Sequence, residues 1–378
     1  MPDAVPPAPS ARPGAQLGLA ELGGWPVVLG RVAAGEDLSS VESAAALREI
    51  LEGAASPSQM AAFIFGLRCK GETSDELTGM LEAMLEVAET VPVPDDLRAR
   101  LVDTCGTGGD RAGTINVSTI AALVVAGAGV PVCKHGGRAA SSRTGSADVL
   151  EALGVEISLP PRSVARCIEE AGIGFCFAPR YHPAMRHVGP TRRELGVPTA
   201  INLLGPLANP GRARYQLVGV GDGRVAERLA TVLGAAGAER AWVVHGHDGL
   251  DELSTAAPST VVEWRAGGPG LRSFVIEPEA LGLAPACIED LKGGDPAANA
   301  GAATAILSGA RGAHRDIVVL NAAAALVVAG DAADLDEGMS RAVESLDGGA
   351  AAACLERLVS LSRSEAAKAR PARLGPPA

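Results

Sequence analysis

The chain has 378 residues, of which 47% are hydrophobic and only 3% aromatic, and its formal charge is −11 at pH 7. This length accommodates two domains or one large domain. The negative charge argues against a general nucleic-acid binder, because gripping a phosphate backbone requires a basic surface. A local site for a phosphorylated small molecule, with a metal ion between the charges, remains compatible with an acidic protein.

The cysteines and the apolar stretches indicate a cytoplasmic protein. There are seven cysteines, an odd number, and no two have CxxC spacing, so neither a disulfide framework nor a common zinc site is expected. No segment resembles a signal peptide. The longest apolar stretches, near 119–133 and 317–330, fall short of the roughly 20 residues that span a bilayer. We therefore expect free thiols in a reducing compartment and no membrane association.

The N-terminal part predicts a helical domain over residues 19–95, between a disordered tail at 1–18 and the α/β region. Three helix starts carry capping signals: Ser39 with Glu42, Ser56 with Gln59, and Thr73 with Glu76. The proline-rich segment 91–94 then ends the helical pattern. At the other end of the chain, the proline-bearing segment 364–378 predicts a flexible tail.

From residue 99 the pattern changes to short β-rich runs that alternate with helical ones. These runs lie at 130–133, 174–177, 215–220, 241–244 and 260–264. The alternation predicts an α/β domain, formed by 99–182 and 207–363, with a mostly parallel central sheet. The periodicity of 275–310 is too weak to define elements. Ligands of such sheets lie beyond the carboxyl ends of the strands, and each motif below follows a strand-like run.

The first motif is Gly106-Thr107-Gly108-Gly109-Asp110, followed by Thr114 and then by Asn116-Val117-Ser118-Thr119 at the start of an apolar helix. Glycines expose backbone N–H groups, and a helix start with hydroxyl side chains attracts phosphate. The alternative is an ordinary strand-to-helix turn with a cap. The added hydroxyls and Asp110 favour phosphate, and two such elements in succession indicate a ligand with more than one phosphate. Cys105 borders the loop and could be a nucleophile, but binding a phosphorylated ligand needs no thiol.

The second motif is Lys134-His135-Gly136-Gly137-Arg138-Ala139-Ala140-Ser141-Ser142, and Gly145-Ser146 opens the next helix. Two cations, two glycines and several serines are typical of an anion-binding cradle. The alternative is that both cations are merely solvated. His135 is a candidate general base, but a role in positioning ligand or backbone is the interpretation that we favour.

Two further segments carry charged candidates. Asp251 and Glu252 follow the run at 241–244 and are hard oxygen ligands suited to Mg²⁺ that bridges phosphates; the alternative is a charged helix start. His245 and His247 lack further soft partners for zinc. The segment 182–210 has a helical pattern, in which Arg192 can pair bidentately with a substrate carboxylate or form an ordinary surface ion pair.

These segments, in this order and together with Lys70-Gly71-Glu72-Thr73, resemble the anthranilate phosphoribosyltransferase family over about residues 25–360. The resemblance implies a nucleoside-phosphorylase-like fold, with a small helical domain joined by about 183–206 and a larger α/β domain. It implies a homodimer and Mg²⁺. The implied reaction transfers the phosphoribosyl group of 5-phosphoribosyl-1-diphosphate to anthranilate, giving N-(5-phosphoribosyl)anthranilate and pyrophosphate in tryptophan biosynthesis.

The resemblance also implies a role for each motif residue. The implied metal ligands are Ser118, Asp251 and Glu252. The implied acceptor-binding residues are Gly106, Gly137, His182 and Arg192. No residue is assigned as an acid or base. The implied donor-binding residues are Gly106, Gly109, Asp110, Thr114, Asn116, Val117, Ser118, Thr119, Lys134, His135, Gly136, Gly137, Arg138, Ala139, Ala140, Ser141, Ser142 and Ser146.

One departure concerns the acceptor. The family usually has asparagine where this chain has Gly137, so one side-chain amide that contacts substrate is missing. This leaves open a transferase for a different aromatic amine or carboxylate, or a nucleoside phosphorylase. A non-catalytic nucleic-acid-binding relative is a further alternative, but the net charge and the retained Asp251-Glu252 pair count against it.

Overall fold

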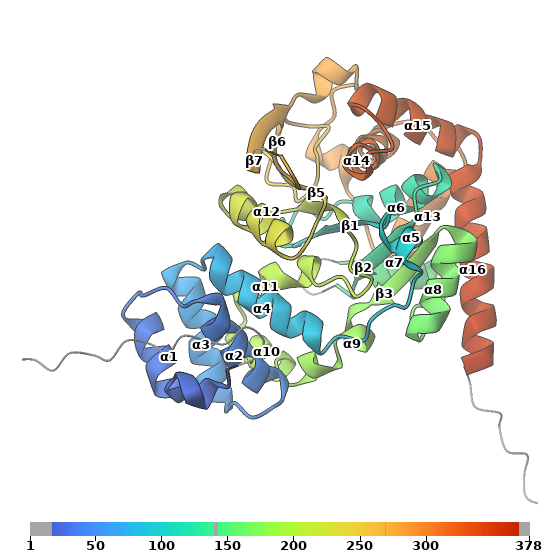
Figure 1. The fold of residues 1–378 in the computed structure, drawn as a ribbon. Coiled ribbons are helices and arrows are strands. Elements are labelled where there is room, and N and C mark those ends of the chain that lie inside the picture. The colour runs from blue at the N-terminus through green and yellow to red at the C-terminus, as the bar shows by residue number, and fades with distance from the viewer. Residues whose placement is uncertain (1–16, 140–142, 269, 370–378) are drawn as a thin grey trace, which may run out of the picture.

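The computed structural model describes residues 17–139, 143–268 and 270–369, which form a helical unit and a larger α/β unit (Figure 1). The α/β unit is built on a seven-stranded sheet with the order β3-β2-β1-β4-β5-β6-β7. The predicted fold class, a small helical part beside an α/β part with a mostly parallel sheet, is confirmed.

The helical unit begins with η1 (Leu19–Leu22) and contains α1 (Gly24–Ala33), α2 (Ser40–Leu51), α3 (Pro57–Lys70) and α4 (Ser74–Glu86). The three predicted caps are present, because Ser39, Ser56 and Thr73 each accept the N–H of the residue three positions later. The apolar faces of these helices bury residues such as Phe63 and Leu77 in one core.

The chain returns to the helical unit after β3. The returning segment contains η2 (Pro183–Arg186), α10 (Gly189–Leu195), α11 (Ala200–Leu204) and η3 (Gly205–Leu207). Both α10 and α11 contact α3, and α11 also contacts α4. Val188 and Leu204 are buried in the same core as α3. A helix from the middle of the chain, which carries Arg192, therefore packs on the N-terminal helices.

Five strands of the sheet are parallel: β1 (Val102–Gly106), β2 (Val132–Gly136), β3 (Ile173–Phe177), β4 (Tyr215–Gly219) and β5 (Arg240–Gly246). They are followed by the antiparallel β6 (Ser259–Arg265) and β7 (Gly270–Ile276). The sequence did not predict β7. This edge strand is largely exposed, so it lacks the apolar run by which the other strands were recognised.

Helices cover both faces of the sheet. Trp242 and Val244 of β5 face a core shared with α6 and α14, whereas Ala241 and Val243 face the core of the helical unit and α12. This alternation is the period of two expected of a strand buried on both sides. The remaining helices are α5 (Asp95–Arg98), α6 (Val117–Gly127), α7 (Ser146–Ala152), α8 (Pro161–Ala171), α9 (Ala178–Tyr181), η4 (Gly223–Val225), α12 (Ala226–Ala235), η5 (Pro278–Leu281), η6 (Ile288–Leu291), α13 (Pro296–Leu307), α14 (Ala313–Ala329), α15 (Leu335–Asp347) and α16 (Ala350–Ala369).

The C-terminal tail was predicted too early. Residues 364–369 continue α16 instead of forming a flexible tail, because this last helical turn packs on α8. There Glu365 is buried and pairs with Arg166 at 2.6 Å and with Lys368 at 2.7 Å. The other tail residues, 1–16 and 370–378, lie outside the described residues. Within the described part of the chain, no helix is both long and apolar enough to cross a membrane.

A buried asparagine ties the returning segment to the sheet. Asn209 follows η3 and donates through Nδ2 to Asp103 Oδ2 and to the carbonyl of Cys133, each at 2.7 Å. Its Oδ1 accepts the N–H of Gly211 at 2.7 Å. Asp103 also accepts the N–H of His135 at 3.2 Å. Burial raises the pKa of Asp103 to about 6, although Lys134 lowers it. One amide thus links β1 and β2 to the chain that enters β4.

We expect Asn209→Ala to lower the free energy of unfolding by about 3 kcal/mol, because it leaves a buried carboxylate oxygen and a buried carbonyl unpaired. The control is Asn202→Ala. Asn202 Oδ1 accepts the N–H and the hydroxyl of Thr199 at the half-buried start of α11, so its loss should cost about 1 kcal/mol. Urea denaturation followed by circular dichroism measures both, and equal losses would contradict the linking role.

Candidate active site

The loop after β1 is open and is held by a carboxylate. Gly106 ends β1, and Gly108 and Gly109 have φ of 67° and 90°, a region that favours glycine. The N–H of Gly108 donates to Asp251 Oδ2 at 2.8 Å. The predicted glycine loop therefore forms at the carboxyl end of β1, and it is linked to a residue that is distant in sequence.

The start of α6 is also held by a carboxylate. Asn116 precedes the helix, and its carbonyl accepts the N–H groups of Thr119 and Ile120 at 3.1 Å. Its side chain forms no cap; instead Nδ2 donates to the carbonyl of Thr144 at 3.0 Å. The N–H of Ser118 donates to Glu252 Oε1 at 3.1 Å. The free N–H groups predicted at this helix start thus meet an acidic side chain.

Asp251 and Glu252 bring the two loops of the first motif together. They lie in a bend after β5 and start no helix, so the alternative of a charged helix start is wrong. The close approach requires glycine. A Cβ at Gly106 would lie 2.3 Å from Asp251 Oδ2, and a Cβ at Gly219 would lie 1.5 Å from Asp251 O. Two strand ends are therefore free of side chains to make room for the acidic bend.

The electrostatics of this bend suit a divalent cation. Burial raises the pKa of Asp251, and the charge of Asp110 raises it further. Burial and the charge of Asp251 raise the pKa of Glu252 in the same way. Within the described residues, no three His, Cys, Asp or Glu side chains form a complete metal cage. Two crowded carboxylates fit Mg²⁺, which takes few protein ligands and completes its shell with water and substrate phosphate.

The second motif lies at the end of β2, and both of its cations have partners within the protein. Lys134 is 2% exposed and donates from Nζ to the carbonyl of Thr104 at 2.5 Å. Arg138 pairs with Asp148 at 2.8 Å and with Glu151 at 2.7 Å. In this conformation neither cation is merely solvated. Ala140, Ser141 and Ser142 lie outside the described residues.

Asp148 closes the ends of this second loop. Its Oδ2 accepts the N–H of Ala139 at 3.0 Å and that of Gly145 at 2.9 Å. Burial opposes ionisation of Asp148, but these two bonds and Arg138 outweigh it and lower its pKa. The carboxylate thus occupies the N–H groups of Ala139 and Gly145, one on each side of the undescribed residues 140–142.

The glycines of the second motif differ in the space around them. A Cβ at Gly136 would lie 2.1 Å from Ser146 Oγ, whereas the nearest atom to a Cβ at Gly137 is the Cβ of Ala178 at 4.0 Å. The carbonyl of Gly137 accepts Ser146 Oγ at 3.3 Å and the N–H of Ala147 at 3.1 Å. The backbone of Gly137 is therefore engaged, but there is room beside it for a side chain.

Two buried histidines lie next to the second motif. The ring centroids of His135 and His182 are 5.1 Å apart, and His182 Nε2 lies 2.9 Å from the carbonyl of Ala208. His135 Nε2 and His182 Nδ1 have no hydrogen-bond partner among the residues that the structure describes. Burial, followed for His135 by the nearby His182, lowers the pKa of both rings. His135 is therefore neutral and a weak base, which supports a positioning role.

The other predicted residues do not take part in the hydrogen bonds that join the loops to the acidic bend. Arg192 is on α10, where burial lowers its pKa. Within the described residues it forms no ion pair and no hydrogen bond to the loops. Thr114 pairs with Lys292 in an isolated bridge. His245 and His247 bond separately, to Val220 O and to Thr260 Oγ1.

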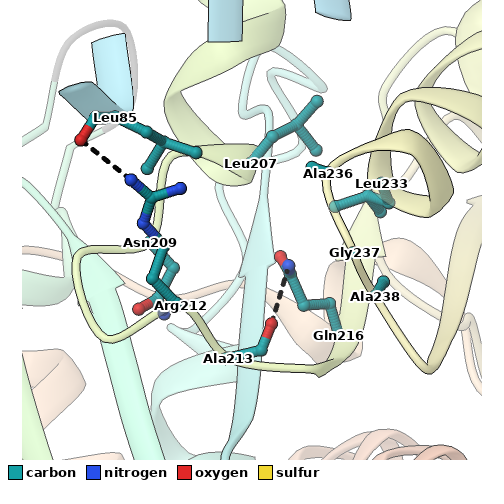
Figure 2. Close-up of a pocket in the computed structure, with 10 residues that line it drawn as sticks. All are labelled: Leu85, Leu207, Asn209, Arg212, Ala213, Gln216, Leu233, Ala236, Gly237 and Ala238. Carbon is teal, nitrogen blue, oxygen red and sulfur yellow. Dashed lines mark hydrogen bonds between the residues drawn. The ribbon is translucent and has the colours of Figure 1, made fainter. Parts of the chain in front are cut away.

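A small cavity lies apart from the motifs (Figure 2). Its volume is about 30 Å³, which is room for about one water molecule. It lies between Leu85 of α4 and Gln216 near the start of β4, and Arg212 donates to the carbonyl of Leu85 at 3.0 Å. The motifs follow the carboxyl ends of the strands, whereas this cavity lies near the start of β4. It is therefore not the candidate active site.

Gly106→Ala is expected to lower the free energy of unfolding by about 2 kcal/mol, because the added methyl group displaces Asp251. Gly137→Ala is the matched control and should stay within about 0.5 kcal/mol. Neither glycine has a positive φ, so the comparison isolates the contact. Urea titration gives both values, and a tolerated Gly106→Ala would contradict the close approach of the bend.

Comparison with known proteins finds relatives that cover most of the chain. Residues 98–352 match the α/β domain of a glycosyl transferase family, and residues 26–88 match its helical bundle domain. The anthranilate phosphoribosyltransferase of Salinispora arenicola is 51% identical over 345 residues, which cover 90% of this chain and 97% of that protein. That of Rubrobacter xylanophilus is 53% identical over 336 residues, covering 89% and 96%.

Solved structures agree. The anthranilate phosphoribosyltransferase of Thermus thermophilus superposes with a TM-score of 0.83 at 44% identity, covering 89% of this chain and 99% of that one. The Saccharomyces cerevisiae enzyme in complex with PRPP and Mg gives 0.81 at 27%, covering 90% and 98%. With the motifs on two loops joined by an acidic bend, the chain belongs to the anthranilate phosphoribosyltransferases of the glycosyl transferase family.

Proposed function

We propose that this protein transfers the phosphoribosyl group of 5-phosphoribosyl-1-diphosphate to anthranilate, giving N-(5-phosphoribosyl)anthranilate and pyrophosphate in tryptophan biosynthesis. The observation that carries the proposal is the junction of two N–H-rich loops at Asp251 and Glu252. Relatives bearing this enzyme name match nearly the full chain. The free cysteines support a reducing, cytoplasmic location.

The donor-binding loops account for the departure of the diphosphate. The bond between C1 of the ribose and the diphosphate oxygen breaks as the bond from C1 to the amine nitrogen forms, and the nitrogen then loses a proton. The backbone N–H groups of the loop at 106–110 and of the α6 start would orient the diphosphate. Asp251, Glu252 and the Ser118 hydroxyl would hold Mg²⁺. When bound, Mg²⁺ would offset the charge of the leaving group.

The acceptor side needs positioning more than base catalysis. An aromatic amine is already nucleophilic, and the buried His135 is a weak base because its pKa is lowered. Arg192 has no carboxylate partner within the described chain, so its guanidinium remains available for the carboxylate of anthranilate. Gly106, Gly137 and His182 would line the path of the acceptor. A solved yeast relative contains 4-fluoroanthranilate.

The helical unit supports the proposed homodimer. An apolar groove of about 490 Å³ lies on it and is lined by α1 and α3 residues that include Leu29, Ala62 and Gly66. Val27 and Phe65 of the same helices are 46% and 42% exposed. Exposed apolar surface of this kind is typical of contacts between subunits. We therefore propose that two copies associate through the helical units.

The double change Asp251→Asn, Glu252→Gln is expected to reduce turnover by roughly 100-fold or more, because it removes the negative charge that holds Mg²⁺. Glu279→Gln is the control, since Glu279 is exposed in η5 and belongs to none of the motifs. Pyrophosphate release over a Mg²⁺ titration measures the effect. Undiminished turnover of the wild type at very low Mg²⁺ would contradict the metal assignment.

Arg192→Gln should raise the KM for anthranilate by roughly tenfold and leave the KM for the donor nearly unchanged, because a charge-assisted bidentate pair contributes about 1.5–3 kcal/mol. The neighbouring Arg193→Gln is the matched control, since Arg193 is exposed. Initial rates with each substrate varied in turn separate the two constants. An equal rise in both would place Arg192 outside the acceptor site.

A second candidate function is the same transfer to a different aromatic amine or carboxylate, and the open space at Gly137 favours it. Pyrophosphate release against a panel of acceptors, together with the loss of anthranilate fluorescence, distinguishes the two. A Cβ at position 137 would meet no described atom outside its chain neighbours closer than 4.0 Å, so Gly137→Asn should not reduce the use of anthranilate. If neither form consumes anthranilate while another amine is used, the proposed acceptor is wrong.

A further inference from the structure

Buried asparagines recur at the supports of the candidate site. The chain contains only five asparagines, and three of them, Asn209, Asn299 and Asn321, are at most 2% exposed. Asn299 lies on α13 and Asn321 on α14, in a part of the chain that carries none of the sequence motifs. A buried amide is retained only where both its oxygen and its nitrogen find partners.

Asn299 closes a ring of hydrogen bonds behind the start of α6. Its Nδ2 donates to Asn116 Oδ1 at 2.8 Å, and its Oδ1 accepts the N–H of Gly294 at 2.7 Å. Asn116 donates to the carbonyl of Thr144 at 3.0 Å, and Thr144 Oγ1 donates to the carbonyl of Gly294 at 2.8 Å. The side chain of Asn116 is thus fully engaged by the protein itself.

The segment before α13 also supports the loop that leads into α6. The N–H of Gly293 donates to Gly113 O at 2.9 Å, and the N–H of Ile115 donates to Leu291 O at 3.0 Å. A Cβ at Gly293 would lie 2.4 Å from Asn299 Oδ1. Backbone bonds and one amide therefore fix the path of residues 113–116 from behind.

Asn321 holds the acidic bend in a similar way. Its Oδ1 accepts the N–H of Leu253 at 3.0 Å, and its Nδ2 donates to the carbonyl of Leu253 at 2.9 Å. Nδ2 also bonds to the carbonyl of Ile317 in its own helix at 2.9 Å. Both backbone groups of the residue next to Glu252 are therefore attached to a fully buried helix side chain.

We infer that Asn299 and Asn321 are positioning residues, Asn299 for the diphosphate-binding loops and Asn321 for the metal-binding bend. The inference rests on the proposed function. Both act through other residues: Asn299 through Asn116 and the loop neck, and Asn321 through the backbone beside Glu252. The loss of either amide would leave buried peptide groups unpaired and allow the attached loop to shift. Shifts of about 1 Å suffice to weaken a site that depends on aligned donors.

Asn299→Leu and Asn321→Leu test this inference, and each is the matched control of the other. The probe is inorganic pyrophosphate. Titration calorimetry measures its binding to the protein at several Mg²⁺ concentrations. Asn299→Leu should weaken pyrophosphate binding at saturating Mg²⁺ by about tenfold, with little change in the Mg²⁺ requirement. Asn321→Leu should raise the Mg²⁺ concentration for half-maximal binding by about tenfold, with little change at saturation.

The aspartate variants keep the test decisive if a leucine variant does not fold. Asn299→Asp and Asn321→Asp each retain the accepting oxygen and lose the donated bonds, so they should change the same constants in the same directions. The inference would be overturned if variants at both sites changed the pyrophosphate affinity and the Mg²⁺ requirement equally. It would also be overturned if folded variants bound pyrophosphate like the wild type. Either result would indicate a purely structural role.

The outcome is separable from that of the proposed function. If the wild type binds pyrophosphate with Mg²⁺ but forms no phosphoribosylated anthranilate, the proposed function fails while the positioning roles are still tested. A wild-type protein that binds no pyrophosphate at any Mg²⁺ concentration would overturn both.

Discussion

Two adjacent carboxylates hold the candidate site together. Asp251 accepts an N–H from the loop after β1, and Glu252 accepts one from the start of α6. These bonds partly offset the burial and the neighbouring acidic charges, Asp110 for Asp251 and Asp251 for Glu252, that raise the pKa of both groups. Under the proposed function, a bound divalent cation would supply the remaining compensation by neutralising the two carboxylates. Asp251 lies so close to Gly106 and Gly219 that neither position has room for a side chain.

The rest of the fold keeps that junction in place. The ends of the parallel strands set the positions of the loops. Asn209 links strands β1 and β2 to the segment that returns from the helical unit, and Asn321 links the acidic bend to α14. Because β4 and β5 pack against the core of the helical unit on one face, a movement of that unit would be transmitted to the sheet that carries the acidic bend. Arg192, the proposed acceptor residue, lies on α10, which packs on α3 of the helical unit.

Local sequence signals predicted most of the fold and the loops of the site. Capping boxes such as Ser39 with Glu42, apolar runs and glycine loops are contiguous in sequence, and the corresponding elements form. Contacts between distant segments left no such signal. Nothing near Asn299 in the sequence indicates that it bonds to Asn116, and nothing near Asn321 indicates that it bonds to Leu253, next to Glu252. Nor does the sequence indicate that Arg138 turns to the acids of α7, because that choice depends on how the helix is placed.

The most direct test of the account is a crystal structure of the protein with 5-phosphoribosyl-1-diphosphate and Mg²⁺. Mg²⁺ is expected at about 2.1 Å from a carboxylate oxygen of Asp251 or Glu252. Diphosphate oxygens are expected on the N–H groups of the 106–110 loop and of the α6 start. A metal ion away from this bend, or a diphosphate bound elsewhere on the chain, would contradict the central claim.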